Sequence, residues 1–324
     1  MNAFEQAAST GEQISGPPSQ TDYLLDRSFR GIATVCAWFI LIIVGLIMGE
    51  IGIKAIPAIS EYHIGFLTGT TWDVNKQTFG ILPEIWGTLY SSILALVIGG
   101  FFGITMAIFL TQDFLPAPLA LFFRTVVELL AAIPSVVYGF WGIFVVIPFI
   151  RPLADWLHTE FSWIPIFSTS LSGPGMLPAA LVLSIMILPT IAAVSQDALR
   201  LVPYRIKEAA YGLGANRWEV ILKVMLPTAS TGIFGALVLG FGRALGETMA
   251  LAMLVGNSNQ LSLSLFSPGN TLAALLALNF PEAGEREIPV LMYVALVLLL
   301  ITFAVNMAGT AIMSLTSNQM KAGK

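Results

Sequence analysis

Long apolar stretches alternate with short polar segments along most of the chain. Six of them are close to the roughly 17–25 residues that an α-helix needs to cross a bilayer, at about residues 31–53, 85–110, 122–150, 176–198, 229–255 and 288–314. This pattern predicts an all-α integral membrane protein with six transmembrane helices. The third stretch is long and contains Pro134 and Pro148, so we expect one kinked helix or a helix with a bent end.

Composition narrows the class of protein further. Hydrophobic residues make up 56% of the chain and charged residues 10%, and the mean hydropathy is +0.83, whereas about a quarter of an ordinary soluble domain is charged. The net charge of −4 offers no basic excess for a nucleic-acid partner. The single cysteine, Cys36, and the widely separated His63 and His158 indicate no disulfide or metal site. We therefore expect membrane lipid around the chain and no cofactor bound by it.

The polar ends and the charge distribution predict the domains and the topology. Residues 1–28 are acidic and lack the basic start and apolar core of a cleaved signal peptide, so we interpret them as a disordered cytoplasmic tail. Residues 29–84 would form the first transmembrane helix and an outer loop, residues 85–316 the main membrane domain, and residues 317–324 a second cytoplasmic tail. With a cytoplasmic amino terminus, ten of the 15 Lys and Arg residues lie inside and four outside. Both termini are therefore predicted to be cytoplasmic.

The fifth apolar stretch contains two charged residues, Arg243 and Glu247. A charge at the centre of a bilayer costs about 2.5–3.5 kcal/mol on insertion scales, so an ionisable residue there is a functional-site hypothesis. Four residues apart on one helix, the two side chains would share a face, and we expect them to pair. Together with Thr248 we assign them to a substrate pathway, with a permanent ion pair that braces the helix bundle as the alternative.

The pattern Arg-x-x-x-Glu recurs at Arg124 and Glu128, near the predicted inner end of the third stretch. We treat these residues as a candidate second charge pair; a structural pair or an arginine that reaches the membrane interface is the alternative. The cluster around Arg243 has no histidine, cysteine pair or acid dyad, so a membrane-embedded enzyme has little support. The chain also lacks the Gly-x-x-x-x-Gly-Lys-[Ser/Thr] phosphate cradle of many ATPases.

The densest cluster of charges lies in residues 201–227, between the fourth and fifth apolar stretches. Pro203 can begin a short helix, Gly212 and Gly214 permit a reversal, and Ala215–Met225 would form a second short helix before Pro227. Such a helix–turn–helix can fit into a groove of a partner. A solvated loop that anchors two spans is the simpler interpretation from these residues alone.

A family resemblance favours docking into a partner over a solvated anchoring loop. Glu208-Ala209-Ala210, three residues, Gly214, nine residues and then Val224–Pro227 resemble the EAA loop of ABC importer permeases, with Val224 in place of isoleucine as the one departure. In that family the loop docks into the ATP-hydrolysing subunit. The resemblance implies that residues 201–227 couple the chain to an ATPase, with these residues in the coupling element: Glu208, Ala209, Ala210, Gly214 and Pro227.

Two further segments, Ile133–Gly139 and Arg243–Ala250, are similar to the permease subunits of the phosphate-specific ABC importer, and to its C-type subunit more than to its A-type partner. The similarity covers most of residues 85–315. It implies a type I ABC importer permease fold and a non-catalytic subunit that forms the translocation pathway for inorganic phosphate. The partners it implies are an A-type second permease, two ATP-binding subunits that use ATP and Mg, and an extracytoplasmic phosphate-binding protein, at a bacterial inner membrane.

Two other functions stay open at this point. One is a permease for a different oxyanion, molybdate or sulfate, because an arginine does not by itself distinguish these anions from phosphate. The other is a secondary transporter or channel that works without ATP. Such a protein would be expected to have related halves with interrupted spans in matching positions, and would not need the cytoplasmic loop.

Overall fold

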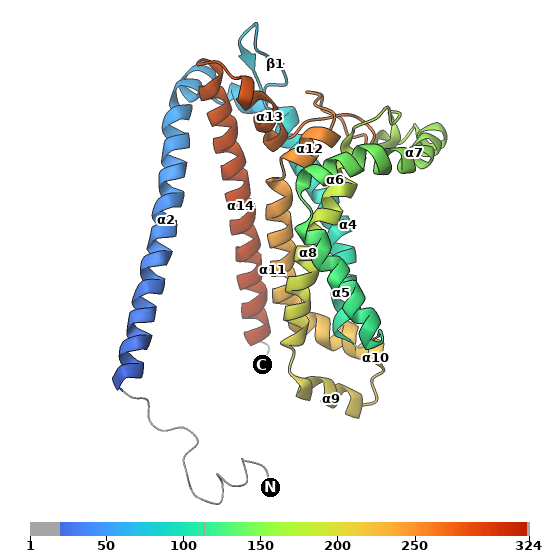
Figure 1. Ribbon diagram of the computed structural model, residues 1–324. Coiled ribbons are helices and arrows are strands. Elements are labelled where there is room, and N and C mark those ends of the chain that lie inside the picture. Colours follow the sequence, from blue (N-terminus) through green and yellow to red (C-terminus); the bar gives the residue numbers. More distant parts are fainter. Residues whose placement is uncertain (1–19, 113, 323–324) are drawn as a thin grey trace, which may run out of the picture. The chain divides into compact units, whose positions relative to one another are not determined.

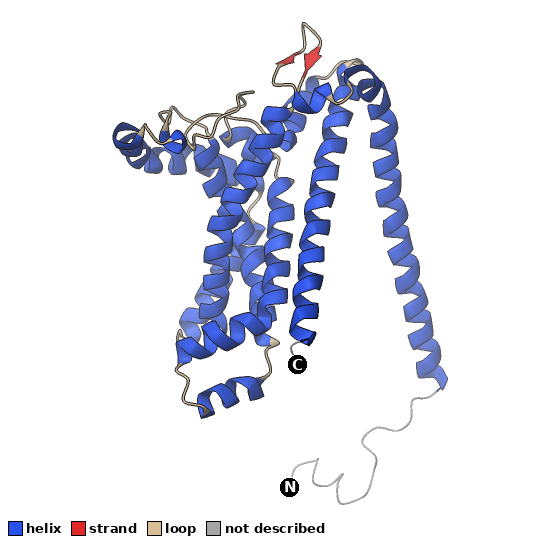
Figure 2. Cartoon of the chain, turned by 180° about the vertical axis from the view of Figure 1, so that it is seen from behind, coloured by secondary structure: helices blue, strands red, loops and turns tan. Residues whose placement is uncertain are grey.

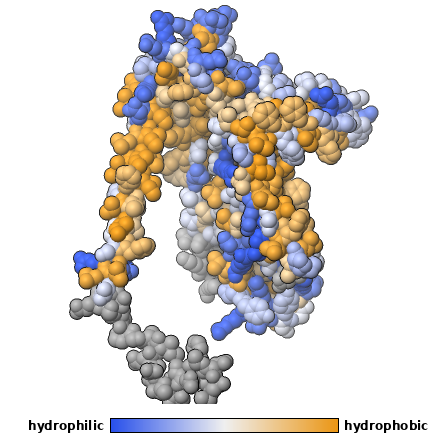
Figure 3. Space-filling model, viewed as in Figure 1, coloured by the Kyte–Doolittle hydropathy of each residue, from blue (hydrophilic) through white to orange (hydrophobic). Residues whose placement is uncertain are grey.

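The computed structural model describes residues 20–112 and 114–322, in two compact units, residues 1–53 and residues 54–324. The described part of the first unit belongs to helix α2 (Gln20–Tyr62), which continues into the second unit. Its apolar side chains before Lys54 are mostly exposed, and hydrophobic residues cover it in Figure 3. Such a surface suits contact with lipid.

Both segments that the sequence predicted as tails are partly helical. Residues 20–28 are helical rather than disordered, because Tyr23, Leu24 and Leu25 extend the apolar run of α2 toward the amino terminus. Residues 1–19 lie outside the described part of the chain. At the other end helix α14 (Glu287–Ala322) continues through most of the predicted tail 317–324.

Six helical segments among the described residues are long and apolar enough to cross a membrane, which confirms the predicted number. They are Tyr23–Tyr62, Leu82–Thr111, Ser135–Phe161, Met176–Arg200, Arg217–Leu245 and Glu287–Ser314. The elements in the first half of the second unit are α3 (Gly65–Thr68), β1 (Trp72–Asp73), β2 (Thr78–Phe79), α4 (Leu82–Thr111), α5 (Ala117–Ala132), α6 (Ser135–Trp141), the π-helix η1 (Gly142–Val146), α7 (Ile147–Phe161) and the 3-10 turn η2 (Pro165–Phe167).

The second half of this unit is also helical (Figures 1 and 2). Its elements are α8 (Met176–Arg200), α9 (Tyr204–Gly212), α10 (Arg217–Glu219), the π-helix η3 (Val220–Met225), α11 (Leu226–Leu245), α12 (Met249–Leu254), α13 (Leu272–Asn279), the 3-10 turn η4 (Phe280–Glu282) and α14. Helix α9 and the carboxyl end of α14 lie at one end of the unit, and β1, α7 and α13 lie at the other (Figure 1).

The third apolar stretch is divided, not kinked. Helix α5 ends at Ala132, and Ile133 and Pro134 are extended, with ψ angles of 128° and 142°. A residue before proline avoids the α conformation, because the proline ring crowds its backbone. The third long helical segment therefore begins after Pro134 and runs to Phe161, well beyond the predicted end at about residue 150.

Two prolines inside long helical segments are preceded by π-helical turns. Segment η1 ends two residues before Pro148, and η3 ends two residues before Pro227. Proline lacks an N–H group and crowds the carbonyl of the preceding turn, and a wider turn relieves that conflict without ending the helix. The predicted separate helix Ala215–Met225 is therefore wrong, because residues 217–245 form one continuous helical segment.

The centre of the second unit is the pair α4 and α8, with α11 packed beside both and α14 beside α11. Glycine allows α4 and α8 to approach closely: a Cβ atom on Gly99 would lie 2.7 Å from the backbone oxygen of Ser184. Fully buried residues such as Ile187 and Ile191 fill the space between the helices. This core fixes the position of α8, which carries one face of the candidate site.

Candidate functional site

Helix α11 ends inside the fifth apolar stretch. Its last residue is Leu245, Gly246 follows with φ −95° and ψ 2°, and helix α12 begins at Met249 after Thr248. Glycine is a weak helix former, and Thr248, a β-branched residue, takes the position before the new helix. The expectation that Arg243 and Glu247 lie one turn apart on the same helix is therefore wrong.

Arg243 lies in the last turn of α11, where a positive charge is favourable next to the negative end of the helix dipole. Its Nη1 atom donates a hydrogen bond of 3.1 Å to Oγ1 of Thr190. Thr190 is close to the midpoint of α8, and the Arg243 side chain is exposed on the surface of this chain. A guanidinium at this depth is costly in lipid, so the face that carries it requires water or a second protein chain.

Glu247 has a different partner from the one that the sequence predicted. Its Oε1 atom accepts a hydrogen bond of 3.2 Å from the backbone N–H of Ala250, in the first turn of α12. Among the described residues, no ion pair within 4.0 Å joins it to Arg243. The break in the helix separates the two side chains, because Arg243 lies at the end of α11 and Glu247 lies just before α12. Thr248 lies beside it, half-buried.

Helix α6 packs against α12, next to the break. A Cβ atom on Gly139 would lie 2.6 Å from Sδ of Met253 and 3.5 Å from the Cα atom of Ala250, both in α12. The Tyr138 hydroxyl donates a 2.8 Å hydrogen bond to the carbonyl oxygen of Leu130 in α5. The segments Ile133–Gly139 and Arg243–Ala250, far apart in the sequence, therefore meet at this break.

The second predicted charge pair is also not formed in the described structure. Arg124 and Glu128 lie on α5, yet no ion pair within 4.0 Å joins them. The Nε atom of Arg124 is buried and has no hydrogen-bond partner. Both residues line a cleft against α8. The two Arg-x-x-x-Glu patterns thus share a property that the sequence did not reveal: each arginine lies beside α8 without an ion pair to its own glutamate.

The predicted coupling residues divide into an exposed tip and a buried support. Glu208 and Ala209 on α9 are exposed, and Gly214 follows with φ +86°, a conformation that favours glycine. Leu213 at the tip is 90% exposed. Ala210 is half-buried, and its side chain packs against the apolar cluster under the loop. Pro227 lies apart from the tip, in the first turn of α11.

One contact near this loop was missed by the sequence analysis. The ring of Phe114, between α4 and α5, stacks on Trp218 with ring centroids 5.1 Å apart, and the guanidinium carbon of Arg217 lies 4.0 Å from the centroid of the Phe114 ring. Such contacts are each worth about 0.5–1.5 kcal/mol. Phe114 thereby ties the start of α5 to the helix that follows the coupling loop. Thr190 was missed as well, because nothing in its own segment marks a partner.

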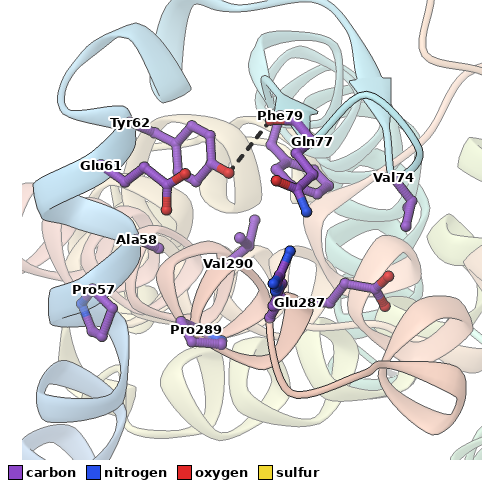
Figure 4. A pocket seen from close by; sticks show the side chains of 11 residues that line it. Pro57, Ala58, Glu61, Tyr62, Val74, Gln77, Phe79, Glu287, Pro289 and Val290 are labelled. Carbon is purple, nitrogen blue, oxygen red and sulfur yellow. Dashed lines mark hydrogen bonds between the residues drawn. The ribbon is translucent and has the colours of Figure 1, made fainter.

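A cavity of about 500 Å³ lies at the opposite end of the unit from α9, between the end of α2, the β1–β2 hairpin and the start of α14. Its lining includes the carboxylates of Glu61 and Glu287, labelled in Figure 4, and one arginine, Arg286. Two acids with one base do not favour an anion. We therefore place the candidate substrate site at Arg243 and not in this cavity.

Comparison with known proteins identifies the family of the chain. The sequence profile of the family described as binding-protein-dependent transport system inner membrane component matches residues 99–313. The chain belongs to that family. The phosphate transport system permease protein PstC of Pasteurella multocida is 39% identical over 87% of this chain and 90% of its own length, and that of Mesorhizobium japonicum is 38% identical over 94% and 95%.

A solved structure supports the fold independently. The crystal structure of a bacterial ABC transporter involved in the import of the acidic polysaccharide alginate contains a chain with a TM-score of 0.59 and 16% identity, which covers 91% of this chain and 99% of that one. At this identity the similarity concerns the fold alone. The chain therefore has the fold of type I ABC importer permeases, and it is a multi-pass membrane subunit.

Proposed function

We propose that this chain is the permease subunit of an ATP-driven importer of inorganic phosphate in a bacterial inner membrane. Its relatives named as phosphate transport permeases match it over nearly their whole length, which supports phosphate as the substrate. An A-type second permease would complete the pathway, two ATP-binding subunits would bind ATP and Mg, and an extracytoplasmic binding protein would deliver the anion.

The observation that carries the proposal is the position of Arg243. Its guanidinium is exposed beside a helix break, halfway along α8, and Thr190 receives a hydrogen bond from one of its nitrogens. The remaining N–H groups can bind two oxygens of a phosphate in parallel, which a lysine cannot do. Arg243 would therefore lower the barrier for the anion in the middle of the membrane. Because Glu247 is held by Ala250, the guanidinium need not leave a carboxylate first.

The exposed tip of α9 supports the coupling part of the proposal. Leu213 at the tip is 90% exposed, and Leu201 before α9 and Tyr204 at its start are 82% and 70% exposed. Large apolar side chains exposed along one segment are typical of a docking surface. In this proposal Glu208, Ala209 and Gly214 contact the ATP-binding subunit, and movement of the loop reaches Arg243 through the continuous helical segment 217–245.

The experiment that tests this function is uptake by the purified importer complex in proteoliposomes. We expect uptake of radiolabelled phosphate that requires ATP, the ATP-binding subunits and the binding protein. An excess of unlabelled phosphate should suppress it, and equal amounts of sulfate or molybdate should not. Competition by sulfate or molybdate would instead assign a different oxyanion. Full uptake by complexes without the ATP-binding subunits would overturn the ATP-driven mechanism in favour of a secondary transporter.

A further inference from the structure

A cleft of about 300 Å³ separates α5 from α8 on the side of Arg243 that leads toward α9. Arg124 and Glu128 of α5 line it together with four residues of α8: Ala193, Gln196, Asp197 and Arg200. Figure 3 shows hydrophilic surface running between apolar flanks along the side of the unit where α8 lies. A polar cleft in this part of an otherwise apolar bundle needs an explanation.

Arg124 is the unusual member of this cleft. Its Nε atom is buried and no described group accepts a hydrogen bond from it. An unsatisfied buried donor is destabilising, and more so for a charged group. Arg200, in contrast, is exposed and lies 3.9 Å from the carboxylate of Asp197. The cleft therefore holds one arginine whose Nε atom lacks an acceptor and one that has only a distant ionic partner.

The cleft is continuous with the site at Arg243 along a single face of α8. Thr190, Ala193, Asp197 and Arg200 follow one another at intervals of three or four residues, which places them on the same side of the helix. Thr190 accepts the hydrogen bond from Arg243. Arg200 is ten residues further along, or about 15 Å at 1.5 Å per residue, toward α9. Arg243 of α11 therefore meets this face at its midpoint, through Thr190, and Arg200 of α8 lies at its end.

We propose that the cleft between α5 and α8 is a second, weaker binding station for a phosphate-class oxyanion, at which Arg124 and Arg200 receive the anion after it leaves Arg243. This inference rests on the proposed function, because it takes the pathway at Arg243 as its starting point. Asp197 and Glu128 balance the two positive charges while the station is empty. Weak binding suits an exit, because conduction requires sites that also release the ion.

Charge-selective labelling tests the station directly. Cys36, the single cysteine, is replaced by serine, and Ala193, exposed on the cleft, is replaced by cysteine. In the assembled importer complex, the labelling rates of this cysteine are measured with methanethiosulfonate reagents of opposite charge, from the mass of this chain. We expect Arg124→Gln to lower the ratio of anionic to cationic rates by up to about 30-fold, because about 1 kcal/mol between unit charges 4 Å apart in water changes each rate about fivefold, in opposite directions.

Matched variants separate this effect from general damage to α5. Thr125→Ala changes the neighbouring residue, whose hydroxyl bonds the backbone of α5 itself, and should leave the ratio unchanged. Glu128→Gln removes a negative charge and should raise the ratio. Added inorganic phosphate should slow labelling of the cysteine at position 193, and Arg124→Gln should remove that protection.

Three outcomes would overturn the station. The first is a ratio of labelling rates that Arg124→Gln does not change, and the second is labelling that phosphate does not slow. The third is no labelling by either reagent, which would mean that a partner subunit fills the cleft. Each can occur while Arg243→Gln still abolishes phosphate uptake, and then only the second station fails. Normal uptake with Arg243→Gln would instead contradict the pathway on which the station rests.

Discussion

At the scale of single residues, the hydrogen bond between Arg243 and Thr190 joins positions 53 residues apart. The arginine could be found from the sequence, because a charge in an apolar stretch is conspicuous. Its partner could not, because a threonine in a membrane helix commonly bonds its own backbone, as Thr105 does to Phe101. Glu247, four residues away, looked like the natural partner only because an unbroken helix was assumed.

The Arg243–Thr190 bond predicts a defect in Thr190→Val, which removes the acceptor and retains the side-chain shape. Hydrogen bonds to charged groups are worth about 1.5–3 kcal/mol, so we expect phosphate uptake by the reconstituted complex to fall by at least about tenfold. Thr228→Val is the matched control, because Thr228 on α11 bonds only the backbone of its own helix. Equal uptake in both variants would show that Thr190 does not position Arg243.

The coupling tip predicts a difference between two neighbouring glycines. Gly214 has φ +86°, whereas Gly212 is the last residue of α9, and neither would contact another atom through an added Cβ. A left-handed conformation costs a residue with a Cβ atom roughly 1–2 kcal/mol. Gly214→Ala should therefore weaken binding of the ATP-binding subunits by about 5- to 30-fold, as measured by co-purification, and Gly212→Ala should not. The same loss in both variants would remove the argument from backbone strain.

At the scale of elements, the sequence predicted the membrane spans, which depend on the average hydrophobicity of long stretches. The six spans were visible because the bilayer demands long apolar helices. The interruptions were not: the apolar stretch 229–255 includes a helix end at Leu245, and stretch 122–150 includes the break at Pro134. Both depend on one or two residues and on the helices packed against them. In the coupling loop, the short helix after Pro203 and the reversal at Gly214 were predicted, because the reversal uses glycine at a positive φ, whereas the separate helix after it was not found.

The stack on Phe114 predicts a link between the coupling loop and α5. Phe114→Ala removes both the ring contact with Trp218 and the contact with Arg217. We expect ATP hydrolysis by the complex to continue, with fewer phosphate ions transported for each ATP. Phe101→Ala on the exposed surface of α4 is the control. An unchanged ratio of transport to hydrolysis in Phe114→Ala would exclude this link.

At the scale of the whole molecule, the second unit presents two surfaces that a single chain leaves incomplete. One is the face that exposes Arg243 halfway along α8, and the other is the apolar tip around Leu213. The first requires water or a second protein chain in place of lipid, and the second suits a docked partner. Membership of a transport-system family fits both surfaces, because in a multi-subunit system other subunits can cover the face at Arg243 and bind the tip at Leu213.

The most direct test of the Arg243 pathway is phosphate uptake by the reconstituted importer with Arg243→Gln, measured beside Arg243→Lys and the unaltered complex. Co-purification of all subunits reports assembly in the same preparations. We expect Arg243→Gln to assemble, to hydrolyse ATP and to lose uptake, and Arg243→Lys to retain a part of it, since a lysine keeps the charge without the paired donors. Uptake at the unaltered rate with Arg243→Gln would contradict a pathway at Arg243, and failure to assemble would identify Arg243 as a structural brace.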